Sequence, residues 1–117
     1  MIWTLLQVAL GGAIGACLRF LTVAFVGAPL ATLAVNVLGS FVMGVLCVVL
    51  ASRSAFSPFL MTGILGGFTT FSAFSMDALK LWESGETLQA GAYVMGSVLF
   101  SLAAVFAGAA LARGALT

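Results

Sequence analysis

The sequence predicts an all-α integral membrane protein with four transmembrane helices per chain, the third of which is broken. Hydrophobic residues make up 63% of its 117 residues and charged residues only 6%, with a mean hydropathy of +1.29. Soluble domains carry roughly 25% charged residues. The few charges of this chain are therefore not expected to cover a water-facing surface. A segment rich in glycine and hydroxyl residues interrupts the third apolar stretch, and this interruption predicts the break.

The first two spans are predicted over about residues 2–26 and 30–51. Each is long enough to supply the roughly 20 apolar residues that cross a bilayer core. The short segment Gly27-Ala28-Pro29 separates them, because glycine and proline punctuate regular structure.

The third and fourth spans are predicted over about residues 59–82 and 88–112. Pro58 can open the third span, because proline is tolerated in the first turn of a helix. The polar segment Glu83-Ser84-Gly85-Glu86 is the clearest loop, and Arg113-Gly114 is expected to end the fourth span. The whole chain, residues 1–117, is therefore predicted to be a single four-helix transmembrane domain.

Residues 66–75 read Gly-Gly-Phe-Thr-Thr-Phe-Ser-Ala-Phe-Ser. Paired glycines loosen a helix, and the β-branched residues Thr69 and Thr70 favour it less than leucine would. Broken backbone is tolerated at membrane depth only where protein or a water-filled cavity satisfies its polar groups. This segment is therefore expected to line a site or a pathway.

Small residues recur at the spacing that lets membrane helices approach closely. Gly11 and Gly15 form a GxxxG pair, and Ser40 and Gly44 form a second pair of the same kind. These motifs indicate tight packing and say nothing about chemistry. Four helices of minimal length leave little material to enclose a pathway, so at least a dimer is expected.

The charges specify no clear orientation in the membrane. With four spans, Arg53 and Arg113 fall on one side and Lys80 on the other, while Arg19 lies within the first span, nearer the side of Lys80. The positive-inside rule therefore predicts no clear orientation, because the few basic residues are divided almost equally between the two sides. A chain of this kind can insert both ways, and antiparallel dimerisation would follow naturally. The net charge of +1, without a basic cluster, argues against nucleic acid as a partner.

Three spans present hydroxyl, amide or aromatic side chains at helical spacing, so each carries a line of them along one face. Interhelical hydrogen bonding and aromatic packing are the ordinary explanations. An amide in the membrane interior is costly and often functional, which makes Asn36 the strongest single candidate. The lines are Thr32, Asn36 and Ser40; Phe71 and Phe74 beside Ser72 and Ser75; and Tyr93, Ser97 and Ser101.

Ionisable residues are informative mainly where they are missing. Proton-coupled exporters usually need an acid or histidine inside the membrane, and the first, second and fourth spans contain neither. Asp77 is interpreted as an interfacial residue at a helix end. Arg19 has two explanations, which are snorkelling to the interface and attraction of anions into a vestibule.

Residues 66–75 closely resemble the third-span signature of the Fluc (CrcB-type) fluoride channels. Residues 11–16 followed by Arg19, and the run from Asn36 to Ser40, resemble the first and second spans of that family. The resemblance covers essentially the whole chain, including its length and number of spans. The third-span motif is highly specific, whereas the GxxxG elements are common.

The resemblance implies an antiparallel, dual-topology homodimer with two fluoride pathways and a third helix that breaks at the dimer centre. It implies that the backbone carbonyls of Gly66 and Thr69 hold a central structural sodium ion. It also implies a basic vestibule residue at Arg19. The expected fluoride pathway consists of Phe71, Phe74, Asn36, Tyr93, Ser97 and Ser101, joined by Thr32 and Ser72.

The resemblance thus implies a passive fluoride-selective channel that protects the cell by exporting fluoride across the inner membrane. It is not expected to be an enzyme. Its expected partners are fluoride, sodium, the lipid bilayer and a second copy of the chain. Two alternatives stay open at this point, namely a small multidrug-type proton-coupled exporter and a non-transporting subunit of a larger membrane assembly.

Overall fold

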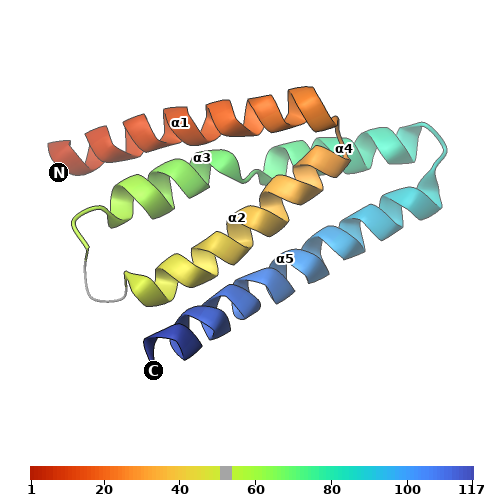
Figure 1. The fold of residues 1–117 in the computed structure, drawn as a ribbon. Coiled ribbons are helices and arrows are strands. Elements are labelled where there is room, and N and C mark those ends of the chain that lie inside the picture. Colours follow the sequence, from red (N-terminus) through yellow and green to blue (C-terminus); the bar gives the residue numbers. More distant parts are fainter. Residues whose placement is uncertain (51–53) are drawn as a thin grey trace.

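The computed structural model describes residues 1–50 and 54–117, and its helices follow the four expected spans (Figure 1). The first span is α1 (Ile2–Val26) and the second is α2 (Leu30–Val49). The fourth is α5 (Thr87–Leu116). The third consists of a π-helix, η1 (Pro58–Leu65), then α3 (Gly66–Phe68) and α4 (Phe71–Glu83).

All four helical stretches are long and apolar enough to cross a membrane, so the chain is a multi-pass membrane protein. Pro58 occupies the start of the third stretch, as predicted. Arg113-Gly114 does not end the fourth helix, which continues to Leu116, because neither residue prevents a further helical turn. The second helix ends at Val49, and the predicted boundary at residue 51 and the Arg53 loop lie outside the described residues.

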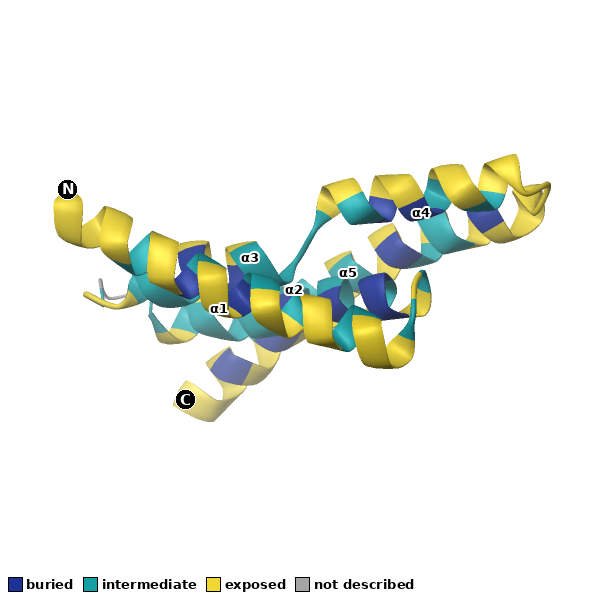
Figure 2. Ribbon diagram, turned by 90° about the horizontal axis from the view of Figure 1, so that it is seen from above, coloured by how far each residue is buried: buried dark blue, intermediate teal, exposed yellow. Residues whose placement is uncertain are grey.

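The helices pack in two groups. α1 packs along η1 and α3, while α2 packs along α5, and α4 returns against α5. Figure 2 shows α4 set apart from α1 and joined to α3 by an extended segment. Both termini lie at the same end of the molecule (Figure 1).

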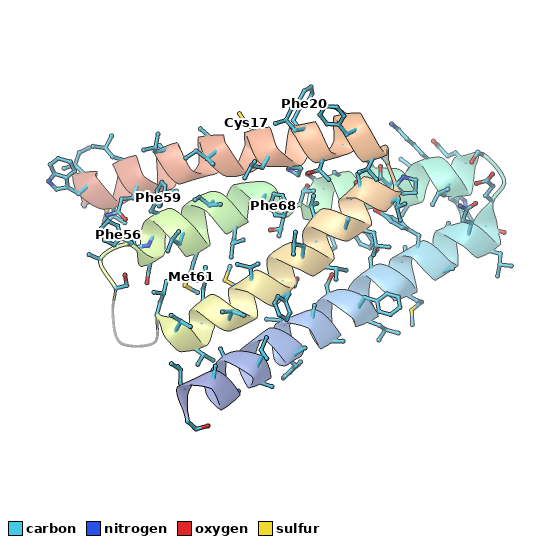
Figure 3. The ribbon with its side chains drawn as sticks, viewed as in Figure 1. Cys17, Phe20, Phe56, Phe59, Met61 and Phe68 are labelled. Atoms are coloured by element: carbon cyan, nitrogen blue, oxygen red, sulfur yellow. The ribbon has the colours of Figure 1, made fainter. Side chains whose placement is uncertain are left out.

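Glycine contacts explain how the helices come so close. A Cβ atom at Gly15 would overlap the Ile64 carbonyl, and one at Gly44 would overlap the Val105 carbonyl. The predicted small-residue packing of the first two spans is therefore confirmed at these positions. On the opposite side of α1, Cys17 and Phe20 point away from the other helices (Figure 3).

The single chain is more open than a compact globular domain. Its radius of gyration is 15.5 Å, whereas a globular chain of this length is expected near about 13 Å. Only a few side chains are fully covered, among them Val35 and Thr32 at the start of α2. Much of the surface is therefore available to lipid or to a second copy.

Candidate functional site

The third span breaks at Thr69 and Thr70. Both have extended backbone, with φ/ψ of −86°/156° and −155°/124°, between the end of α3 and the start of α4. The Thr70 hydroxyl caps the new helix by accepting the Ala73 amide at 3.1 Å. Gly66 stays helical, at φ −63° and ψ −35°. The break predicted within residues 66–75 is confirmed, and it falls at Thr69 and Thr70 while the glycine pair stays helical.

Backbone groups released by the break find a partner on α2. In an unbroken helix the Thr70 amide would donate to the Gly66 carbonyl. Here it donates instead to Asn36 Oδ1 at 2.8 Å, and Asn36 Nδ2 donates to the Thr70 carbonyl at 3.0 Å. The Asn36 amide thus satisfies both backbone groups of Thr70 inside the membrane, where an unpaired group is costly.

A cavity of about 260 Å³ opens beside the break. A second hollow of about 230 Å³ shares Ser40, Thr69 and Ser101 with it, so the two lie next to each other along α2 and α5. Among the described residues, none that lines either one is charged. The first cavity is lined by Asn36, Ser40, Thr69, Thr70, Phe71, Phe74, Ser97, Val98 and Ser101.

Aromatic rings form one wall of this site. Phe71 and Phe74 are arranged edge to face, with ring centroids 5.4 Å apart and an interplanar angle of 61°. Phe74 is buried and also contacts the Tyr93 ring at 5.4 Å, whereas Phe71 is 78% exposed in the single chain. Edge-to-face geometry places the positive edge of one ring against the negative face of another.

The hydroxyl residues divide between the cavity and other positions. Ser97 is buried and its Oγ has no hydrogen-bond partner in the described part of the chain, although it lines the cavity together with Ser101. Thr32 is buried but does not line the cavity. Ser72 is exposed, with its Oγ 3.3 Å from the Thr70 hydroxyl. The structure therefore gathers Ser97 and Ser101 at the site and leaves the other two at its margin.

Asp77 is the site feature that sequence reasoning placed wrongly. It lies in the middle of α4, is only 9% exposed, and accepts a hydrogen bond from the Tyr93 hydroxyl at 3.1 Å. The interpretation as a helix-end residue is therefore wrong, because Asp77 lies in the interior of α4. α4 continues past it to Glu83 and turns it toward α5. The lack of other acids in the spans was the one signal in the sequence that could have drawn attention to it.

The residues expected near a cation and in a vestibule also lie at the break. Arg19 Nε donates to the Gly67 carbonyl at 3.1 Å. The Gly66 carbonyl has lost its usual donor, since the Thr70 amide bonds to Asn36. No cluster of three or more His, Cys, Asp or Glu side chains suited to a metal exists in residues 1–50 and 54–117. The break leaves the carbonyls of Gly66 and Thr69 without their α-helical donors, because the Thr70 amide bonds to Asn36 and the Ala73 amide bonds to the Thr70 hydroxyl.

Fold and site together define a small multi-pass membrane protein in which a broken span faces a neutral cavity lined by hydroxyl and aromatic groups. Comparison with known proteins agrees. The chain belongs to the CrcB family, because residues 6–109 match the family model described as "CrcB-like protein, Camphor Resistance (CrcB)". The resemblance drawn from the third-span motif is confirmed.

Curated relatives of the chain carry the name "Fluoride-specific ion channel FluC". One from Cereibacter sphaeroides is 57% identical, covering 97% of this chain and 98% of the relative. Another from Paracoccus denitrificans is 52% identical and covers 95% of each. A third from a Ruegeria species is 48% identical over the full length of both. These names describe channels, not enzymes, and give no support to a proton-coupled exporter or an assembly subunit.

Proposed function

We propose that this protein is a passive fluoride-selective channel that exports fluoride across the cell inner membrane. One observation carries the proposal: an uncharged cavity lies at the helix break, where Phe71, Phe74, Ser97, Ser101 and Asn36 come together. The proposal is supported by full-length relatives that are named fluoride-specific channels.

Dehydration is the main barrier for fluoride, which is small and strongly hydrated. The unpartnered Ser97 hydroxyl and the Ser101 hydroxyl can donate to the ion. Each hydrogen bond to a charged group contributes roughly 1.5–3 kcal/mol. Aromatic edge contacts at Phe71 and Phe74 add only about 0.5–1.5 kcal/mol each. Hydroxyl donors therefore do most of the work of replacing water, and the rings supplement them.

The electrostatic setting favours entry without trapping the ion. α4 begins at Phe71, which lines the cavity, so the positive end of its helix dipole faces the pathway. The lining itself is neutral, and conduction requires binding weak enough for the ion to leave. The Tyr93 hydroxyl donates to Asp77. Tyr93 therefore contributes to the pathway through its ring, which supports Phe74.

A structural sodium ion fits the oxygen donors at the break. The Gly66 carbonyl lacks its helical donor, and Thr69 turns its backbone out of the helix with ψ of 156°. Carbonyls of unwound helices coordinate sodium in other membrane proteins. A bound sodium would add a positive charge near the pathway. At ~10 Å and an effective dielectric of ~20, one charge contributes about 1.7 kcal/mol to an anion.

An antiparallel, dual-topology homodimer would complete the site. The extended backbone at Thr69 and Thr70 and the exposed Phe71 and Ser72 lie within a membrane span. The polar groups among them that face outward, such as the Ser72 hydroxyl, are tolerated at membrane depth only where protein or water satisfies them. A second copy would cover them, and a two-fold axis through the breaks would give two pathways. The weak charge bias of the sequence allows both orientations.

Fluoride efflux from liposomes that contain only the purified protein tests the function. An ion-selective electrode would follow fluoride, chloride would serve as the control ion, and a potassium ionophore would balance charge. We expect rapid fluoride release with negligible chloride release. Absence of release from well-folded dimers would contradict the proposal, and uptake of lipophilic cations driven by a pH gradient would instead support an exporter.

A further inference from the structure

Arg19 reaches the helix break from α1, a different helix from the one that carries Asn36. Its side chain is half-buried, and Nε donates to the Gly67 carbonyl at 3.1 Å. Neither explanation drawn from the sequence, snorkelling or anion attraction, includes a bond to the backbone of the third span. The contact therefore calls for an explanation of its own.

The packing of α1 against the third span fixes the position of this side chain. Gly11, Gly15 and Arg19 share one face of α1, at i, i+4 and i+8. A Cβ atom at Gly15 would lie 2.8 Å from the Phe68 amide nitrogen, so the two backbones are in direct contact there. One turn further along, Arg19 reaches the end of α3. Phe20 points outward, away from this contact (Figure 3).

The Gly67 carbonyl needs a donor because the helix stops. The amide that would follow the α pattern belongs to Phe71, which begins a new helix. Carbonyls at the C-terminal end of a helix carry partial negative charge, which a guanidinium complements. Neither Nη atom of Arg19 donates within the part of the chain that the structure describes, so Nε alone makes the contact.

We propose that Arg19 is a positioning residue, whose Nε–H replaces the lost backbone donor at Gly67 and holds α3 where the channel needs it. Gly67 follows Gly66, whose carbonyl is proposed to bind sodium, and precedes the threonines that line the cavity. Arg19 bonds to the Gly67 carbonyl before the break, and Asn36 bonds to Thr70 within it, so the backbone is held on both sides of Thr69. This inference rests on the proposed channel function.

Two substitutions separate the donor from the charge. In Arg19→Gln, the side-chain nitrogen stands at the same number of bonds from Cα as arginine Nε, so the donor is kept and the charge is lost. In Arg19→Lys, a methylene stands at that place, so the charge is kept and the donor is displaced. A positioning role predicts that glutamine substitutes better, whereas a role limited to anion attraction predicts that lysine does.

Fluoride efflux from liposomes tests whether glutamine or lysine substitutes better for Arg19. We expect Arg19→Gln to stay within about threefold of wild type and Arg19→Lys to lose at least about tenfold. Arg113→Gln and Arg113→Lys are the matched controls, because Arg113 is exposed in the last turn of α5, and both should conduct normally. Equal losses in the two Arg19 variants, or a greater loss in Arg19→Gln, would overturn the inference.

Sodium-dependent thermal stability gives a second readout. We expect the sodium concentration for half-maximal stabilisation of the dimer to rise at least about tenfold in Arg19→Lys and to change little in Arg19→Gln. Unchanged sodium dependence in Arg19→Lys would contradict positioning of the cation site. Wild-type protein without fluoride flux would instead refute the proposed function. If Arg19→Lys does not fold, Arg19→Met replaces it, and flux of Arg19→Gln no greater than that of Arg19→Met overturns the inference.

Discussion

Asn36 and Thr70 are joined by two hydrogen bonds, in which the side-chain amide of one residue satisfies both backbone groups of the other. Nδ2 donates to the Thr70 carbonyl at 3.0 Å, and Oδ1 accepts the Thr70 amide at 2.8 Å. The Asn36 side-chain amide, which is unfavourable in the membrane interior, thus stabilises the backbone at the break. One N–H of Nδ2 remains for another acceptor, so the same residue can also serve the pathway.

Replacing Asn36 with Asp should impair fluoride flux and destabilise the fold. A carboxylate oxygen would face the Thr70 carbonyl in place of the donating Nδ2, so one hydrogen bond is lost and two acceptors oppose each other. The expected cost is about 1–3 kcal/mol in the free energy of unfolding. The added negative charge would also repel fluoride. Liposome efflux and thermal unfolding of the purified dimer measure both effects.

Gln89→Glu is the matched control, because it makes the same amide-to-acid change at an exposed position in the first turn of α5. This variant should leave flux and stability close to wild type. Full flux in Asn36→Asp would argue against any role for Asn36 in the pathway or at the break.

Phe71→Ile and Phe74→Ile should each reduce fluoride flux while the dimer persists. Both changes remove an aromatic edge from the cavity wall and break the 5.4 Å ring pair. Phe74 is buried, so its replacement should also lower stability by about 1–3 kcal/mol. Phe71 is exposed in the single chain, so its effect should fall mainly on flux. Efflux assays and size-exclusion chromatography distinguish these outcomes.

Phe106→Ile provides the comparison for Phe71, because Phe106 is 74% exposed and does not line the cavity. It should conduct like wild type. If both cavity variants retained normal flux, the aromatic wall would have no part in permeation.

Gly15→Ala should destabilise the protein, whereas Gly12→Ala should not. A methyl group at Gly15 would overlap the Ile64 carbonyl, and that backbone atom cannot move away cheaply. A methyl group at Gly12 meets no atom of residues 1–50 or 54–117 within 4 Å. Overpacking of this kind costs about 1–3 kcal/mol. Thermal unfolding of the two variants side by side measures the difference, and equal stabilities would contradict the close packing of α1 against the third span.

The sequence was sufficient for the four spans, because apolar length alone identifies them. It was insufficient for the exact place of the break. The glycine pair and the two threonines were both candidates for it, yet a Cβ at Gly67 would come within 2.5 Å of the Gly12 carbonyl, so this glycine serves helix packing. The break falls at Thr69 and Thr70, whose partner Asn36 lies 34 residues earlier than Thr70. A hydrogen bond between residues so far apart in the chain produces no local pattern in the sequence.

Asp77 illustrates the same limit for the site. Its carboxylate meets the Tyr93 hydroxyl across the turn between α4 and α5, 16 residues apart. Hydropathy places an acid near the end of a span at the membrane surface, and only the turn of α4 toward α5 buries it. Two residues of the polar line in the fourth span, Ser97 and Ser101, reach the cavity, whereas the hydrogen bond from Tyr93 to Asp77 was not foreseen.

Asp77 and Tyr93 should therefore prove energetically coupled. Asp77→Ala leaves the Tyr93 hydroxyl without its acceptor, and Tyr93→Phe leaves a buried carboxylate without its donor. Each change should cost about 1–3 kcal/mol. In the double variant neither group is stranded, so its loss should be smaller than the sum by about 0.5–3 kcal/mol. Thermal or denaturant unfolding of the four proteins measures this coupling.

Asp77→Asn keeps an acceptor oxygen for Tyr93, so its stability should lie closer to wild type than that of Asp77→Ala. Strict additivity of the two single changes would show that the hydrogen bond contributes nothing to the fold, and Asp77 would then need another reason to be buried between α4 and α5.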